Sequence, residues 1–179
     1  MRNYRYKERR NMMIRRVGFW IGEIVAAVLL GFLVIHFGFQ TVTVHGESMQ
    51  PAYYDNDVVL VNKLEYRMGE PKTLDAAVLE LENGSTAHYT VKRVIGLPGQ
   101  TVQIVDGNIL IDGEKLNYKF EEEILSAGLA AYSVELGEDE YFVIGDNCNN
   151  SEDSRVANIG NIKRNQFVGK VMGTLKKGH

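Results

Sequence analysis

The stretch TVQIVDGNILIDG, residues 101–113, gives the clearest indication of fold in this 179-residue chain. Two short runs of alternating apolar and polar residues, 101–105 and 108–111, flank an Asp-Gly pair. An Asp-Gly pair supplies the positive φ angles that a two-residue hairpin turn requires, so the stretch predicts an antiparallel β-hairpin.

Similar runs recur after residue 40 and are separated by turn pairs such as Pro98-Gly99 and Asp112-Gly113. The other strand-like runs are TVTVH (41–45), DVVLVNK (57–63), AAVLEL (76–81), HYTVKRVIG (88–96), EYFVIG (140–145) and FVGKVMGTL (167–175). Residues 114–137 have mixed periodicity and predict either a loop or one short helical turn. The fold class predicted is mainly β, with antiparallel sheets.

The segment VGFWIGEIVAAVLLGFLVIHFGF, residues 17–39, contains only Glu23 and His36 as ionisable residues. At 1.5 Å per residue a helix of this length crosses a hydrocarbon core of about 30 Å. The apolar region of a cleaved signal peptide is shorter, so we expect a single transmembrane helix that stays in the mature protein.

Charge is distributed unevenly along the chain. Residues 1–16 carry seven basic side chains and one acidic one, whereas the rest of the chain carries 13 basic and 22 acidic ones. The positive-inside rule therefore predicts a cytoplasmic N-terminus (1–16), a span (17–39) and an extracytoplasmic domain (40–179) in the cell membrane. The acidic balance of that domain argues against nucleic acid as a partner.

Cofactor chemistry has no signature in the sequence. Cys148 is the only cysteine, so no internal disulfide can form. There is no HExxH motif, no paired-cysteine motif and no glycine-rich phosphate loop, and the four histidines lack ligand spacing. We therefore expect neither a metal nor a cofactor, and any catalysis must use ordinary side chains.

Ser48, in GESMQP (46–51), is either a turn residue or a nucleophile that needs a neighbouring base. His45 and His88 form no evident triad with it. Lys92 is another candidate for the base that takes the Ser48 proton, because burial in an apolar strand would lower the pKa of the lysine toward working pH. Because strand side chains alternate, Lys92 and Arg93 should point to opposite sides of the sheet, one into the core and the other outward. The alternative is that both cations are exposed on an edge strand.

The segment GDNCNNSEDSR, residues 145–155, reads on its own as a polar turn. Within it, an Asp153–Arg155 ion pair would either brace a site or lie on the surface.

Taken in order, GESMQP, DVVLVNK, YTVKRVIGLPGQTV (89–102) and GDNCNNSEDSR resemble the sequence boxes of bacterial type I signal peptidases. The size and single span are similar to the short Gram-positive form. The resemblance implies an antiparallel β-sheet catalytic domain of signal-peptidase type. It also implies a membrane-anchored serine endopeptidase that removes signal peptides from exported preproteins, cleaving after small residues in an Ala-x-Ala-like pattern.

By the same resemblance, Ser48 is the nucleophile, Lys92 its general base and Ser151 the residue that orients the lysine. Asp153 and Arg155 form a supporting ion pair. The Ser48 N–H belongs to the oxyanion hole, and Gly46 stands where some relatives carry a second donor hydroxyl. The substrate is expected to bind as an added strand along Thr43, Val44, His45, Glu47, Met49, His88, Tyr89, Thr90 and Val91. Cys148 departs from the pattern, because relatives often carry Arg there.

Two other classes of protein compete with this enzyme. One is a catalytically silent relative that acts in assembly, against which the presence of both Ser48 and Lys92 argues. The other is a self-cleaving cytoplasmic repressor, for which the chain has no DNA-binding module. The expected partners are signal peptides and the lipid bilayer, with the export machinery as a further possibility.

Overall fold

The apolar N-terminal segment forms one long helix, α1 (Arg2–Gly38). The computed structural model describes the backbone of residues 2–83 and 86–178 and the side chains of residues 16–81 and 87–178. Within α1, Arg16–Gly38 has a mean hydropathy of 2.3 and is long and apolar enough to cross a membrane. Phe39 begins the first strand, so the helix ends at Gly38, one residue before the end of the expected span. The chain divides there into two units, Met1–Gly38 and Phe39–His179.

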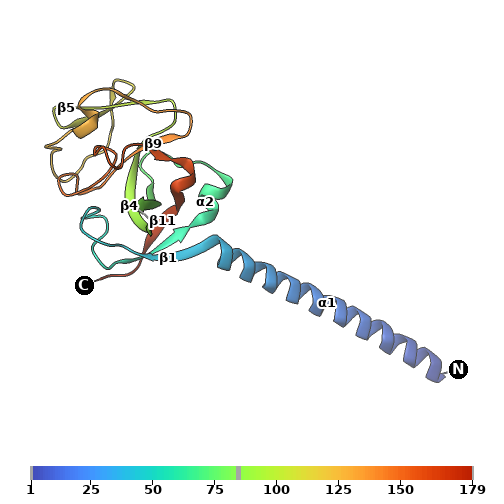
Figure 1. The fold of residues 1–179 in the computed structure, drawn as a ribbon. Helices are drawn as coiled ribbons and strands as arrows, with labels where there is room; N and C mark the ends of the chain where they lie inside the picture. Colours follow the sequence, from blue (N-terminus) through green and yellow to red (C-terminus); the bar gives the residue numbers. More distant parts are fainter. Residues whose placement is uncertain (1, 84–85, 179) are drawn as a thin grey trace. The chain divides into compact units, whose positions relative to one another are not determined.

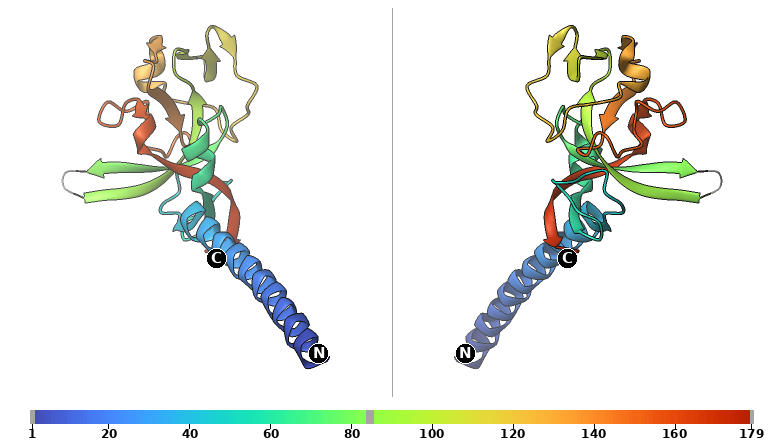
Figure 2. Two further views of the ribbon diagram at one scale, coloured as in Figure 1. Left: turned by 90° about the vertical axis from the view of Figure 1, so that its right-hand side faces the viewer. Right: turned by 90° about the vertical axis from the view of Figure 1, so that its left-hand side faces the viewer.

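The second unit is built on an antiparallel sheet, which has seven strands within the described residues (Figure 1). The strand order is β1-β2-β11-β3-β4-β9-β10. Their bounds are β1 (Phe39–Thr43), β2 (Val58–Asn62), β3 (Ala76–Asn83), β4 (Thr86–Gly96), β9 (Glu140–Ile144), β10 (Ile162–Lys163) and β11 (Phe167–Lys176). Figure 2 shows β3 and β4 as a long hairpin that projects from the rest of the sheet.

A smaller antiparallel sheet lies at the end of this unit away from β1 (Figure 1). Its order is β7-β6-β5-β8, with β5 (Thr101–Val105), β6 (Asn108–Ile111), β7 (Glu114–Lys115) and β8 (Val134–Glu135). Asp106 and Gly107 join β5 to β6 with φ angles of 47° and 70°, which confirms the predicted hairpin and its turn. Of the two alternatives left open for 114–137, a loop or one short helical turn, the 3-10 helix η1 (Gly128–Ala131) bears out the second, although β7 and β8 also lie in this range.

The helix α2 (Lys63–Met68) was not expected from the sequence, because the run DVVLVNK reads as a strand up to Lys63. The Asn62 side chain accepts hydrogen bonds from the N–H groups of Leu64 and Glu65, at 3.0 and 3.3 Å. This N-cap satisfies the first free amides of a helix, so the strand ends at Asn62 and the helix begins. The first predicted strand also ends early, at Thr43, and a 3-10 turn, η2 (Arg164–Gln166), precedes β11.

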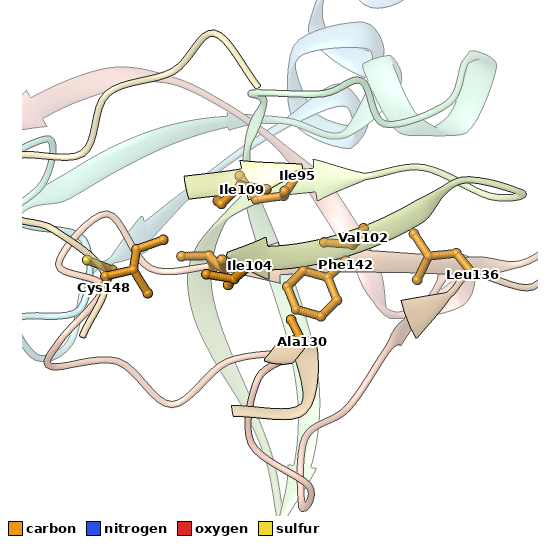
Figure 3. Close-up of a cluster of buried hydrophobic side chains, with 10 residues drawn as sticks. Ile95, Val102, Ile104, Ile109, Ala130, Leu136, Phe142 and Cys148 are labelled. Carbon is orange, nitrogen blue, oxygen red and sulfur yellow. The ribbon is translucent and has the colours of Figure 1, made fainter. Parts of the chain in front are cut away.

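Buried side chains form several hydrophobic clusters around the sheets. One fills the space between the smaller sheet and β9, where Val102, Ile104 and Phe142 pack together (Figure 3). Another packs on β1, β2, β3 and β11 and includes Val44 and Met49. This second cluster lies directly beneath the turn that carries Ser48, so the turn is anchored to the core.

Candidate active site

Ser48 lies in the turn that follows β1. Val44 before it and Met49 after it are buried, and Met49 is 0% exposed. Ser48 itself is half-buried between these two anchors. Gly46 has a φ of 81°, a conformation that a residue with a side chain rarely adopts. Ser48 is therefore a turn residue, and the buried neighbours on either side hold its side chain at the surface of the packed core.

Lys92 lies in β4, between β3 and β9 in the strand order, and is 4% exposed. Its Nζ donates a hydrogen bond to Ser151 Oγ at 3.1 Å. Burial lowers the pKa of Lys92 to about 8, although the nearby charge of Asp153 acts in the opposite direction. The expectation of an inward-facing lysine is confirmed, and the alternative of two exposed cations on an edge strand is wrong.

Arg93 leaves β4 on the opposite face and forms an ion pair that sequence reasoning missed. Its Nη2 lies 2.5 Å from Asp146 Oδ2, and its Nη1 donates to the Leu74 carbonyl at 3.0 Å. Asp146 is buried and Arg93 half-buried, so the expectation that the second cation points out into solvent is wrong. The pairing of Arg93 with Ile144 explains the contact, because Asp146 follows two residues after Ile144. The sequence signal that could have indicated this pair is Asp146 in the GDN segment, residues 145–147.

Gly145 brings the segment 145–155 against the Ser48 turn. A Cβ atom at Gly145 would lie 2.4 Å from the Ser48 carbonyl oxygen and 2.3 Å from Ser151 Oγ, so only glycine fits. The Asn147 N–H donates to the Ser48 carbonyl at 3.0 Å. Ser48 and the Lys92–Ser151 pair therefore meet at one point. A hydrogen bond between the Ser48 and Lys92 side chains is not among the contacts of residues 16–81 and 87–178.

The Asp153–Arg155 ion pair is buried, with side chains 0% and 6% exposed, so its placement on the surface is ruled out. Two parallel hydrogen bonds of 2.8 Å join the guanidinium to the carboxylate, and the Gly145 N–H donates to Asp153 at 3.1 Å. Burial alone would raise the pKa of Asp153, but Arg155, together with hydrogen bonds from Gly145 and Ser151, outweighs it and holds that pKa below its ordinary value. Arg155 also donates to the carbonyl of Cys148, whose own side chain is buried.

Two backbone N–H groups of the Ser48 turn differ in whether they are free to donate a hydrogen bond to a substrate. The Gly46 N–H donates to Asp55 Oδ1 at 2.8 Å. In the part of the chain described here, the Ser48 N–H donates no hydrogen bond. Ser48 therefore has a free donor beside its own hydroxyl, whereas Gly46 has none.

The residues predicted to bind substrate fall into two groups. Thr43, His45, Glu47, His88 and Tyr89 are exposed and Thr90 is half-buried, whereas Val44, Met49 and Val91 are buried in the cluster under the turn. Among the described residues, β4 pairs with β3 from Thr86 to Arg93 but with β9 only from Arg93 onward. Its first half therefore has one open edge, which leads toward Lys92.

Two cavities flank this region, one of about 690 Å³ beside His88 and Glu152 and one of about 180 Å³ beside Gln50 and Asn147.

Among the described residues, no group of three or more His, Cys, Asp or Glu side chains could hold a metal ion. The groups that the site brings together are the Ser48 hydroxyl, the buried Lys92 amine with its lowered pKa and backbone donors.

Comparison with known proteins identifies the family. The family described as signal peptidase, peptidase S26, matches residues 17–175. Signal peptidase I T from Bacillus subtilis (strain 168) is 40% identical over 160 residues, which cover 84% of this chain and 80% of that protein. Signal peptidase I P from Bacillus subtilis subsp. natto is 36% identical over 158 residues, covering 84% of each chain.

A solved structure of a signal peptidase I from Enterococcus faecalis V583 is 29% identical, covers 60% of this chain and 97% of that chain, and has a TM-score of 0.43. The match to the family over most of the chain, together with the Bacillus relatives, shows that this chain belongs to the signal peptidase family, peptidase S26, and is a serine peptidase of the bacterial type I signal peptidase class.

Proposed function

We propose that this chain removes signal peptides from exported preproteins with Ser48 as nucleophile and Lys92 as general base, cutting after small residues. The observation that carries the proposal is the buried Lys92 amine, which contacts Ser151 beside the carbonyl of Ser48. A serine hydroxyl needs a base to take its proton, and a lysine serves only when its amine is neutral. Burial of Lys92 favours that neutral form.

In the proposed reaction, Ser48 Oγ attacks the carbonyl carbon of the scissile peptide while its proton moves to Lys92 Nζ. The tetrahedral intermediate collapses as Lys92 returns that proton to the leaving amine, so the C–N bond breaks and an ester to Ser48 remains. Lys92 then takes a proton from water, whose oxygen attacks the ester, and finally reprotonates Ser48 Oγ. Ser151 orients Lys92 throughout.

The Ser48 N–H is suited to stabilise the oxyanion, because no protein acceptor among the described residues competes for it. One such donor is typically worth about 2.7–4 kcal/mol in the transition state. A second donor would have to come from water or from elsewhere in the backbone, since the Gly46 N–H is already bonded to Asp55.

The substrate would bind as an extra strand along the open edge of β4, with its scissile bond at the level of Lys92. Main-chain hydrogen bonds to a strand edge accept many sequences, which suits an enzyme with many preprotein substrates. The buried side chains of Val44, Met49 and Val91 form the apolar floor near Ser48. Such a packed floor leaves room for small side chains such as Ala rather than large ones.

The helix Arg16–Gly38 would anchor the enzyme in the cell membrane as a single span, with residues 1–16 in the cytoplasm. A signal peptide is itself embedded in the bilayer, so anchoring both partners turns their encounter into a local search. The export machinery, which delivers such substrates, is a natural neighbour of an enzyme placed in this way.

The test is processing of a preprotein by the full-length enzyme in detergent or lipid. Ser48→Ala and Lys92→Ala should each lower the rate by several orders of magnitude, because each removes a group that acts in every turnover. Ser133→Ala and Lys115→Ala are matched controls on exposed residues and should keep the wild-type rate. Processing at the wild-type rate by either of the first two variants would refute the dyad.

A further inference from the structure

The turn that carries Ser48 is tied to a segment about a hundred residues later in the chain. The Asn147 side-chain Nδ2 donates to the Glu47 carbonyl at 3.2 Å, and the Asn147 N–H donates to the Ser48 carbonyl at 3.0 Å. The Asn150 Nδ2 donates to Glu47 Oε2 at 3.1 Å. The residue before the nucleophile is therefore held through both its backbone and its carboxylate.

The same segment also holds the base. Ser151, which accepts the hydrogen bond from Lys92 Nζ, is the neighbour of Asn150. Two adjacent residues are thus linked to the two members of the proposed dyad. Ser151 contacts Lys92 itself, and Asn150 contacts Glu47, the residue before Ser48. A shift of Asn150 relative to Glu47 would change the spacing between Ser48 and Lys92 directly.

The Glu47 carboxylate has a simple environment. It is exposed, and among the described side chains it forms no ion pair. Its partner is a neutral amide, so the contact needs an acceptor oxygen at this position and no negative charge. An exposed hydrogen bond of this kind adds little to folding stability, which leaves its geometric effect open to measurement.

We propose that Glu47 and Asn150 form a clamp that sets the position of Ser48 relative to Lys92. The proposal rests on the proposed function of Ser48 and Lys92. Neither clamp residue transfers a proton or needs to touch substrate, so both are positioning residues. This role differs from the substrate contact that the sequence predicts for Glu47.

The test compares Glu47→Ala, Asn150→Ala, the double variant and Glu47→Gln in full-length enzyme. Each alanine variant should lower kcat about tenfold with KM and Tm near wild type, because misplacing reacting groups by 1 Å can cost about 100-fold and the Asn147 contacts remain. The double variant should be no slower than either single one, since both remove the same contact. Glu47→Gln retains the acceptor oxygen and should recover most of the kcat that Glu47→Ala loses.

Asn149→Ala is the matched control on the same segment. Asn149 contacts Leu125, Glu122 and Glu123 rather than Glu47, so its replacement should leave kcat unchanged. If Glu47→Gln is as slow as Glu47→Ala while Asn150→Ala is normal, the charge of Glu47 acts on substrate and the clamp is refuted. Wild-type kcat in both alanine variants refutes it as well. Ser48→Ala and Lys92→Ala, measured alongside, show separately whether the dyad itself fails.

Discussion

At the scale of single residues, the buried amine of Lys92 has two opposing influences. Loss of hydration disfavours its ammonium form, and the negative charge of Asp153 favours it. Because Asp153 is already paired with Arg155, whose own charge also lowers the pKa of Lys92, desolvation outweighs the attraction. The ion pair thus lets a carboxylate lie close to Lys92 while the pKa of its amine stays below the ordinary value.

A stability prediction follows for Lys92→Met. Below about pH 8 the amine is protonated in both folded and unfolded chains, so folding bears the full cost of burying the charge. Between about pH 8 and 10.5 the unfolded chain binds more protons, and wild-type stability should rise with pH. Lys92→Met should therefore raise the free energy of unfolding at pH 7 by up to about 3 kcal/mol.

Thermal unfolding of both full-length proteins, measured at several pH values, checks this prediction. The difference in Tm between Lys92→Met and wild type should shrink as pH rises through that window. A variant that is less stable than wild type at pH 7 would show that Lys92 is held by favourable contacts as a cation.

At the scale of elements, the segment 145–155 is what joins the distant parts of the site. It leaves β9, which pairs with β4, and it reaches the Ser48 turn through Gly145 and Asn147. The sheet register therefore brings Lys92 to Ser151, and the absence of a side chain at Gly145 allows the Ser48 turn to close on them.

Gly145→Ala should separate these parts. Its methyl group would meet Ser151 Oγ and the Ser48 carbonyl, so we expect at least about a 100-fold loss of preprotein processing. The accompanying loss of stability should be about 1–3 kcal/mol, as for other overpacked sites. Gly173→Ala, in β11, is the control, because a Cβ there meets nothing within 4 Å. Equal activity of the two variants would mean that the closeness of these atoms is unimportant.

Local sequence patterns predicted the elements better than they predicted the contacts. Alternating runs and Asp-Gly turns located the longer strands, because side-chain alternation and turn chemistry are local properties. The two-residue strands β7, β8 and β10 were not predicted, because two residues are too few to show an alternating pattern. The helix α2 escaped, since one Asn62 cap is enough to end a strand. The Arg93–Asp146 pair was also missed, because it depends on the register between β4 and β9, and the two residues are 53 positions apart in the sequence. Ser48, Lys92 and residues 145–155 were grouped by resemblance to a family, and the burial of the Asp153–Arg155 pair emerged only from the fold.

At the scale of the whole molecule, charge distinguishes the two ends of the apolar helix. The seven basic residues among the first 16 favour the cytoplasmic side, and the acidic domain follows the helix. The orientation predicts that a tag after residue 179 reacts with a membrane-impermeant reagent in intact cells, whereas a tag before residue 1 reacts only after lysis. The reverse pattern would overturn the proposed topology.

The most direct test of the dyad is to titrate the Lys92 amine by NMR in full-length enzyme with isotope-labelled lysine, beside the pH dependence of the acylation rate. The signal is assigned by its loss in Lys92→Met. The amine and the rate should titrate together with a pKa of about 8, the rate rising as the proton leaves. A Lys92 pKa near 10.5, or a rate that rises at a pH where Lys92 does not titrate, would contradict the assignment of Lys92 as the base.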